Sequence, residues 1–534
     1  MPRESRINSI PFFLSGILLI LLFPKFSFGY LAWISLIPFL RAVFNAPSRS
    51  QALKGGFITG LLFHAVSLFW LIHVSWFGWI FMALIETAFF VLFALLVYEG
   101  RRIREWHYRI LWMSASWTTC EILRSEIPVF GLPWNLLAYS QTDYSLIRLS
   151  ANAIGAYGLG FVIVWVNAAL DQIWRDFWAL TRMRYWQHLA CGRRSFYELR
   201  KPFLNAALLA GVVILMLLHG QYHQNLTGEQ SGSLRVAVIQ GNIPQEIKWD
   251  ILAREKILDM YMRLSELSVS DQPNLIVWPE AAFPGYFNRD IHADRVKAMV
   301  KELKIPFLIG SPHNESSEVA YNSAYMVNEH GNISGRYDKQ YLVPFGEYVP
   351  LPLIFGWLKP IAYSLGVSDF YEGHESTVFR LPKSDSFFST LICFEDVFPG
   401  LSRKFVEKGA RFLLVITNDA WFMDSSAPYQ HLQASVFRAV ENGVPVVRAA
   451  NTGISAFINK KGEVISRVQD HDGKDIFVTG AKTETIALDE GDTLYRSLGY
   501  LFPYAMIVIL ILLILKRKKD PEFLRKETDA AKSE

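Results

Sequence analysis

The sequence has little cysteine, little charge and no large excess of either sign of charge. Three cysteines in 534 residues exclude a disulfide-stapled scaffold. Charged residues make up only 19% of the chain and the net charge is +4, which excludes a highly charged nucleic-acid binder. No internal repeat and no low-complexity segment is evident. Hydrophobic residues make up 51% of the chain, so it is not disordered and has room for about three or four domains.

The small net charge conceals a segregation of charge along the chain. Residues 1–220 carry 19 Lys and Arg against 10 Asp and Glu, and residues 221–498 carry 27 against 34. A basic, apolar first part followed by an acidic part is typical of a membrane protein that carries a soluble domain. We predict a transmembrane domain at 1–220, a catalytic soluble domain at 221–498, a last transmembrane helix at 499–515 and a tail at 516–534.

Eight apolar stretches are long enough, or nearly long enough, to span a lipid bilayer. A membrane helix needs about 20 predominantly apolar residues and tolerates Gly and Pro better than a soluble helix does. The stretches lie at about 10–24, 29–44, 56–74, 79–98, 109–124, 157–177, 203–219 and 499–515. We therefore predict a polytopic α-helical membrane domain of about eight spans.

The distribution of Lys and Arg predicts the orientation of these spans. Basic residues collect after the fourth stretch at 101–109, after the sixth at 175–201 and in the tail at 516–519, whereas the turn at 75–78 has no charge. Because cytoplasmic loops carry the excess of Lys and Arg, both termini are expected in the cytoplasm. The soluble domain then lies on the outer side of a bacterial inner membrane, in the periplasm.

Polar residues in the membrane part have two interpretations. Arg3 and Arg6 before a short apolar core would suit a cleaved signal peptide, but no clean cleavage site follows and a second span comes at once, which favours a retained helix. Glu86 and Glu121 lie in otherwise apolar helices, where a charge is costly and often functional. Alternatively, these two carboxyls are hydrogen-bonded or protonated structural groups, and we favour this interpretation.

From residue 234 the pattern changes to short β-rich runs separated by helical periods. Near-continuous apolar strands predict a sheet covered on both faces, so the class is α/β with layered sheets and helices. We expect strands at 234–240, 274–278, 306–310, 321–328, 387–393 and 412–417, and helices at about 246–268, 290–304, 398–408 and 429–442.

Three residues at predicted strand ends together suit covalent catalysis. Glu280, Lys339 and Cys393 each follow or end a β-rich run, and the carboxyl ends of strands are where sites assemble in α/β folds. A cysteine nucleophile needs a base to take its proton and a cation to stabilise an oxyanion, and Glu and Lys can supply both. Taken singly, each residue has a structural interpretation: a buried small thiol, a surface carboxylate and a solvated lysine.

Cys393 has no predicted disulfide partner. Cys120 falls in a span and Cys191 in a cytoplasmic loop, which leaves Cys393 as an unpaired thiol in an oxidising compartment. A helix N-terminus after its strand would lower the pKa of this thiol. We predict no metal and no cofactor: the histidines lack ligand spacing, and the sequence has neither a phosphate-binding Gly-rich loop nor a Gly-x-Ser-x-Gly elbow.

In this order, Glu280, Lys339 and Cys393 resemble the Glu-Lys-Cys triad of the nitrilase (carbon–nitrogen hydrolase) superfamily. The segment 234–485 resembles a complete nitrilase-like domain, which implies an α-β-β-α sandwich. Further runs resemble a membrane branch, the apolipoprotein N-acyltransferase family. These are Asp-Lys-Gln-Tyr-Leu-Val-Pro-Phe-Gly-Glu-Tyr-Val-Pro at 338–350, Asn-Asp-Ala-Trp-Phe at 418–422, Arg448 leading into Asn-Thr-Gly-Ile at 451–454, and the outer loop at 133–141.

The resemblance implies a two-step acyl transfer. Cys393, deprotonated by Glu280, would take a fatty acyl chain from a phospholipid as a thioester, with Lys339 at the oxyanion. The free α-amino group of a diacylglyceryl-cysteine at the start of an apolipoprotein would then accept the chain. The implied partners are a phospholipid donor, a diacylated apolipoprotein acceptor and membrane lipid, without nucleic acid.

The resemblance also implies supporting roles for further residues. Glu347 matches a second glutamate of the family, and Glu395 is expected to orient the backbone at the nucleophile. Asn418 and Trp421 belong to a family motif, and Trp421 and Phe422 would line a lipid entrance, unless they are core aromatics. Phe394 stands where the family often has Tyr, and Met423 follows the motif where relatives often have Gly, which leaves the flexibility of that loop open.

Three questions stay open at this stage. The apolar arm at 348–371 would dip toward lipid or cover an acyl pocket, unless it packs against its own domain. A membrane-anchored C–N hydrolase with the same triad is the first alternative function, and a non-catalytic lipid-binding or scaffolding protein is the second. The oligomeric state is not determined, although a membrane part that blocks the sandwich faces would favour a monomer.

Overall fold

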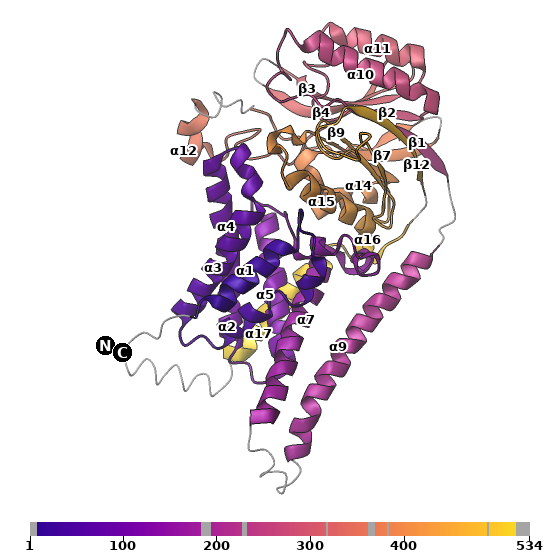
Figure 1. Ribbon diagram of the computed structural model, residues 1–534. Helices are drawn as coiled ribbons and strands as arrows, with labels where there is room; N and C mark the ends of the chain where they lie inside the picture. Colours follow the sequence, from indigo (N-terminus) through magenta and orange to yellow (C-terminus); the bar gives the residue numbers. More distant parts are fainter. Residues whose placement is uncertain are drawn as a thin grey trace. The chain divides into compact units, whose positions relative to one another are not determined.

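The computed structural model describes residues 8–182, 194–226, 232–316, 319–360, 369–381, 384–488 and 491–518 (Figure 1). Its contacts divide the chain into two units. The first comprises Met1–Glu126, Asn135–Gln224 and Tyr500–Glu534, and the second comprises Ile127–Trp134 and Asn225–Gly499. Arg3, Arg6, Arg184, Cys191 and the tail from Lys519, to which the sequence assigned roles, lie outside the described residues.

The first unit is helical. Each of the eight predicted stretches contains helix. Within the described parts of the chain, three segments are long and apolar enough to cross a membrane: Trp76–Gly100, Ala151–Trp178 and Phe203–Asn225. Shorter apolar helices lie at Ile10–Leu21, Gly29–Phe44 and Leu501–Lys516. The helices are α1 (Ile10–Leu21), α2 (Ile37–Phe44), α3 (Arg49–Ser67), α4 (Trp76–Gly100), α5 (Trp106–Glu126), α6 (Ser145–Arg148), α7 (Ala151–Arg182), α9 (Arg194–Asn225) and α17 (Leu501–Lys518).

The predicted count of about eight spans is therefore not confirmed. Prolines explain part of the difference, because a proline disfavours helix at the residue before it and cannot donate its own hydrogen bond. Helix α1 ends before Pro24, and the second stretch is divided where α2 begins, with Pro38 in its first turn.

Glu86 and Glu121 are both hydrogen-bonded, as their structural interpretation expects. Glu86 Oε2 lies 2.9 Å from Arg124 Nη1, which joins α4 to α5. Glu121 Oε1 accepts a hydrogen bond from the Leu137 backbone N–H at 2.9 Å. Both carboxyls are buried, so these contacts offset part of the cost of removing them from water.

The second unit contains two six-stranded sheets, in the strand orders β12-β1-β2-β3-β4-β5 and β11-β10-β9-β8-β7-β6. The first sheet is formed by β1 (Ser233–Gln240), β2 (Leu275–Val277), β3 (Phe307–Asn314), β4 (Ala320–Val327), β5 (Ile333–Asp338) and β12 (Gly480–Ala487). The second is formed by β6 (Phe379–Leu381), β7 (Ser386–Ile392), β8 (Phe412–Thr417), β9 (Val446–Ala450), β10 (Ala456–Ile458) and β11 (Val464–Arg467).

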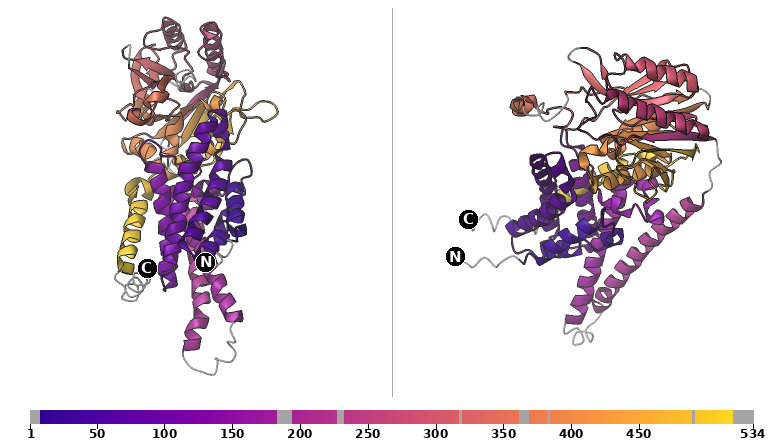
Figure 2. Two further views of the ribbon diagram at one scale, coloured as in Figure 1. Left: turned by 90° about the vertical axis from the view of Figure 1, so that its left-hand side faces the viewer. Right: turned by 45° about the horizontal axis from the view of Figure 1, so that its top comes forward.

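Helices cover the outer face of each sheet, which confirms the predicted α/β sandwich. On the first sheet, α10 (Arg254–Ser268) and α11 (His292–Leu303) lie side by side (Figure 2) and bury apolar side chains such as Leu258 against Phe307. The second sheet is covered by α14 (Pro399–Glu407) and α15 (Ala427–Asn442) (Figure 1). The sheets face each other through contacts of β1 with β9 and of β4 with β7.

The six predicted strands are present, but several other elements were not predicted or were misplaced. Helix α10 begins at Arg254 and not at 246, because turns occupy the residues after Pro244. The sequence analysis missed β9, in which Arg448 interrupts the apolar run, and it missed the short edge strands. Strand β7 ends at Ile392, so Cys393 lies just beyond it.

Parallel pairing brings the ends of three strands together. Ile392 of β7 pairs with Ile416 of β8, and Thr417 of β8 pairs with Ala450 of β9. In the other sheet, β1, β2 and β3 are parallel as well. The residues that follow these strands therefore gather at one edge of each sheet.

Gly310 allows β3 to pass close to the segment that follows β2. A Cβ atom at position 310 would lie 2.2 Å from the Pro279 carbonyl oxygen and 2.8 Å from the Glu280 Cα. Both neighbours are backbone atoms, so only glycine fits here without movement of Glu280.

We expect Gly310→Ala to destabilise the protein by about 1–3 kcal/mol, the usual cost of overpacking. The measurement is the melting temperature of the detergent-purified protein. Gly356→Ala is the matched control, since nothing lies within 4 Å of a Cβ at that position. Equal melting temperatures for the two variants would contradict the close approach.

Candidate active site

The structure places Glu280 and Lys339 in one buried site with a second carboxylate. Glu280 follows β2 by three residues, and Lys339 directly follows β5. Lys339 Nζ lies 3.7 Å from Glu280 Oε1 and 2.8 Å from Glu347 Oε2. Asn322 Nδ2, on β4, donates to Glu280 Oε1 and to Glu347 Oε1, both at 2.7 Å. Two carboxylates thus share one cation and one amide.

The two carboxylates keep Lys339 charged. Burial by itself would lower the pKa of Lys339, but the nearby charges of Glu347 and Glu280 outweigh burial and raise this pKa above its usual value. Lys339 is therefore a cation at neutral pH, in a position where water does not compete with it. Such a fixed charge can stabilise an oxyanion.

Cys393 shares this site, and its thiol is neutral at rest. Burial raises the pKa of Cys393 well above its usual range, and the Glu280 charge raises it further while Lys339 opposes the rise. The expectation that a helix N-terminus lowers this pKa is wrong, because only a short 3₁₀ turn, Cys393–Val397, follows β7 at the half-buried Cys393. A neutral thiol needs a nearby base to become a nucleophile.

Glu395 joins the nucleophile segment to the lysine segment. Its carboxyl accepts hydrogen bonds from Ile392 N at 2.7 Å, from Gln340 N at 2.6 Å and from the Tyr337 hydroxyl at 2.7 Å. Burial raises the pKa of Glu395 to about 7, although these hydrogen bonds act in the opposite direction. The contacts suit the predicted role of orienting the backbone at Cys393.

The other predicted residues lie around the site, and among the described residues no hydrogen bond or ion pair joins them to Glu280 or Lys339. Asn418 Nδ2 donates to Gln245 Oε1 at 2.8 Å, and Asn418 Oδ1 accepts from Asn451. Phe394 packs edge-on against Phe398. Trp421 is 40% exposed, so it is a surface aromatic and not a core residue.

Lys248 is a site residue that the sequence analysis missed. Its Nζ donates to the backbone oxygen of Glu280 at 3.1 Å, and the side chain is buried. Burial lowers the pKa of Lys248 to about 8, against the opposing charges of Glu280 and Cys393. The position of Lys248 shortly after β1 could have identified it as a site residue, since the other site residues also follow strands. The expected helix from 246 concealed it.

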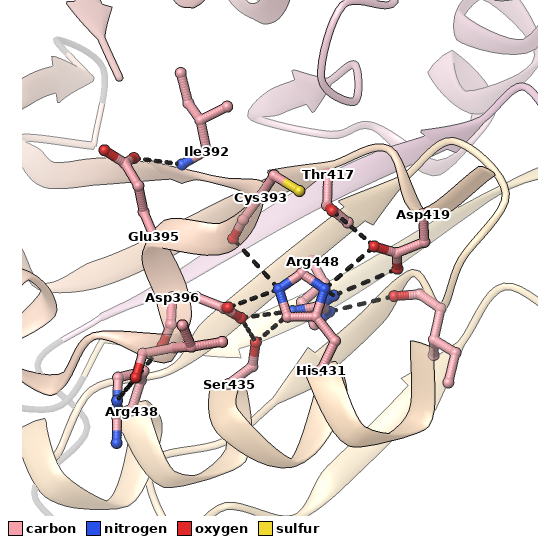
Figure 3. Close-up of polar contacts among 12 residues, drawn as sticks. Ile392, Cys393, Glu395, Asp396, Thr417, Asp419, His431, Ser435, Arg438 and Arg448 are labelled. Carbon is pink, nitrogen blue, oxygen red and sulfur yellow. Dashed lines mark hydrogen bonds and ion pairs between the residues drawn. The ribbon is translucent and has the colours of Figure 1, made fainter. Parts of the chain in front are cut away.

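A buried ion cluster lies next to Cys393 (Figure 3). His431 Nε2 is 2.7 Å from Asp396 Oδ1, and His431 Nδ1 is 3.2 Å from Asp419 Oδ1. Arg448 Nη1 lies 2.7 Å from Asp396 Oδ2. All four side chains are almost completely buried. The sequence analysis assigned no role to His431, Asp396 or Asp419, because they are adjacent only in space.

Each member of the cluster stabilises the charge of the others. Burial would raise the pKa of Asp396 and of Asp419, but the charge of His431, followed by that of Arg448, lowers both below the usual value. Burial would lower the pKa of His431, but Asp396 in particular raises it to about 9, against the repulsion of Arg448. Two negative and two positive charges are thus buried without net charge.

The described residues contain no group of three or more His, Cys, Asp or Glu side chains that could hold a metal ion. Cys120 and Cys393, the two cysteines among them, are both free. The described side chains of the site offer a thiol, carboxylates and lysines.

Comparisons with known proteins agree with this geometry. Residues 15–169 match the family described as the apolipoprotein N-acyltransferase N-terminal domain, and residues 235–488 match the carbon–nitrogen hydrolase family. An apolipoprotein N-acyltransferase of Geobacter metallireducens is 34% identical over 97% of this chain and 96% of its own length. Another, of Haemophilus influenzae, is 30% identical over 94% and 93% of the two chains.

A solved structure of an amidase from Nesterenkonia sp. is similar to about half of the chain. It is 19% identical, covers 49% of this chain and 93% of its own, and superposes with a TM-score of 0.37. A likeness this distant does not bear on the activity.

The raised pKa of His431 predicts how stability depends on pH. Its pKa rises from 6.5 to about 9 on folding, so its contribution to stability is fully present below pH 6.5 and is lost as the pH rises through about 9. The shift corresponds to about 3 kcal/mol. Melting temperatures between pH 6 and 10 should fall for the wild type over this window.

His431→Gln should flatten this pH dependence, whereas His330→Gln, at an exposed position, should retain it. The same slope in His431→Gln and in the wild type would show that His431 is not charged in the folded protein.

Proposed function

The chain belongs to the apolipoprotein N-acyltransferase family, and we propose that it moves a fatty acyl chain from a phospholipid to the N-terminal amine of a diacylated apolipoprotein. Membership of the family makes it an N-acyltransferase with a carbon–nitrogen hydrolase domain. The observation that carries the finer proposal is the buried group formed by a neutral Cys393 thiol, the charged Lys339 and the Glu280 carboxylate.

In the first step, Glu280 takes the proton of the Cys393 thiol. The sulfur forms a bond to the carbonyl carbon of a phospholipid ester, and Lys339 stabilises the oxyanion. The carbon–oxygen ester bond then breaks, Glu280 returns the proton to the leaving oxygen, and a lysophospholipid departs. A general base contributes about 10²–10⁴-fold to such a step, and an oxyanion donor contributes about 3–4 kcal/mol.

In the second step, the free α-amino group of a diacylglyceryl-cysteine attacks the thioester carbon. A carbon–nitrogen bond forms and the carbon–sulfur bond breaks, while the proton lost by the amine passes through Glu280 back to the thiolate. The final amide is the most stable of the three acyl bonds and draws the ester and thioester steps forward, so the sequence of steps needs no ATP and no cofactor. Glu347 supports both steps because it holds Lys339 in place.

Exposed apolar side chains on the catalytic unit suit a lipid donor. The segment with α12 (Pro352–Phe355) and the turn Gly356–Leu358 exposes Leu353 completely and Trp357 by 71%. Part of the arm packs against its own domain, because Val349 is buried and the ring of Phe355 lies 5.5 Å from that of Phe345, whereas Leu353 and Trp357 remain exposed; residues 361–368 of the arm lie outside the description. Apolar side chains of this size in water mark a surface for lipid. Trp421 is a further exposed aromatic on this unit.

The placement in the membrane is part of the proposal. Three apolar helices and the predicted excess of Lys and Arg in alternate loops support a multi-pass protein of the bacterial inner membrane. Its catalytic domain would face the periplasm and both termini the cytoplasm, which places the thiol on the side where lipoproteins mature.

Purified enzyme incubated with phospholipid should gain the mass of one fatty acyl group on Cys393. Intact-protein mass spectrometry measures the gain, hydroxylamine should remove it, and Cys393→Ala should not show it. A diacylated lipopeptide with a free amine should discharge the adduct and become N-acylated. Discharge to water alone would indicate a hydrolase, and a folded wild type without any adduct would overturn the thioester.

Glu280→Gln should slow formation of this adduct by about 10²–10⁴-fold, because an amide cannot take the thiol proton. The side chains have nearly the same shape and Glu347 still pairs with Lys339 at 2.8 Å, so the variant should remain folded, which its melting temperature checks. Glu302→Gln, at an exposed position on α11, is the control. Acylation of Glu280→Gln at the wild-type rate would remove Glu280 from the role of base.

A further inference from the structure

The backbone at Cys393 is in an unfavourable conformation that its neighbours must hold. Its φ is +53°, in the left-handed region, which is unfavourable for a residue other than glycine. On the N-terminal side, Ile392 N donates to Glu395 Oε2 at 2.7 Å. On the C-terminal side, the Cys393 carbonyl oxygen lies 3.3 Å from His431 Nε2. The backbone of Cys393 is therefore held from both sides, and the two proposed steps assign no role to the contact with His431.

The contacts of His431 require a charged ring. Carboxylate oxygens only accept hydrogen bonds, and His431 faces one on each side: Asp396 Oδ1 at Nε2 and Asp419 Oδ1 at Nδ1. A neutral imidazole has a single N–H and would present a lone pair to one of the carboxylates. With both nitrogens protonated, each carboxylate receives a donor, and the Nε2–H also points to the Cys393 carbonyl.

The surroundings of His431 keep this charge. The charged or titratable groups that face the ring are Asp396, Asp419, Cys393 and Arg448, whose Nη2 is 3.3 Å from Nδ1. Arg448 would repel the ring, but it is itself paired with Asp396 at 2.7 Å and lies 3.9 Å from Asp419. The pKa of His431 is accordingly raised to about 9, so the ring stays charged at neutral pH.

Trp134 lies over the ring and closes the cluster. The centroids of Trp134 and His431 are 5.4 Å apart with an interplanar angle of 33°, and Trp134 Nε1 donates to Gln430 Oε1 at 2.7 Å. The indole is buried and belongs to the segment Ile127–Trp134 of the same unit. An aromatic face over a cation is favourable, and burial keeps water from replacing the contacts of the ring.

We infer that His431 is a positioning residue for the acyl transfer. Its charged ring holds the carbonyl of Cys393, so that the strained backbone directs the sulfur toward Glu280 and Lys339. This inference rests on the proposed function for its purpose, but the placement of the thiol can be measured without any lipid.

The test replaces His431 without leaving an unbalanced buried charge. In the double variant His431→Leu/Asp419→Asn, Asp396 and Arg448 still form a neutral pair, and no N–H reaches Cys393. The rate at which iodoacetamide alkylates Cys393 is followed by peptide mass between pH 7 and 10, with melting temperature as the check on folding. We expect alkylation to be at least about 10-fold slower than in the wild type. Acylation at saturating phospholipid should fall on the order of 10²-fold, as misplacement by about 1 Å can cause.

Two further variants sharpen the result. His431→Gln keeps one N–H donor and should recover part of the alkylation rate, and it takes the place of the double variant if that protein does not fold. His330→Gln should behave as the wild type.

Wild-type alkylation by a folded double variant or by folded His431→Gln would overturn the role of His431. A wild type that is alkylated but never acylated would instead overturn the proposed function, and the ratio of alkylation rates would still decide whether His431 places the thiol.

Discussion

The Lys339 ammonium group lies 2.8 Å from one carboxylate and 3.7 Å from another, and almost none of it reaches water. A lone buried cation would lose its proton, so the site depends on Glu347 and Glu280 both being present. The same geometry leaves Glu280 adjacent to a thiol that burial keeps neutral. In the proposed mechanism, this ion triad supplies a fixed positive charge for an oxyanion and a carboxylate for the thiol proton.

The strand arrangement of the sandwich brings these groups together. Parallel strands of each sheet end at one edge, and Gly310 lets β3 approach the Glu280 backbone to a distance no side chain would allow. Glu395 then ties the end of β7 to the segment after β5. His431 and its partners hold the opposite side of Cys393. Strain at the nucleophile is thus stabilised by buried polar contacts and not by local sequence.

Several elements were predictable because their signals are local. The buried strands at 234–240 and 412–417 are continuous apolar runs, and helix α15 follows a clear helical period. Strand β9 was not predicted because a lone arginine in an apolar run usually indicates an exposed position. In the structure, the Arg448 side chain is instead buried in an ion cluster. The predicted count of about eight spans is not confirmed, because hydropathy does not show where a helix ends, as α1 does before Pro24, or where one begins, as α2 does with Pro38 in its first turn.

By itself, the sequence determined the class of fold and singled out Glu280, Lys339 and Cys393 as candidates for catalysis, since strand periodicity and the residues that follow each strand are local features of the chain. Only the tertiary structure decided that Lys248 contacts the Glu280 backbone, that Cys393 has a raised pKa, and that His431 lies between two carboxylates. Asp396 and His431 are 35 residues apart and the partners of Lys248 and Arg448 are similarly distant. Burial and charge act through space over a few ångströms, so these properties follow from packing and not from position in the chain.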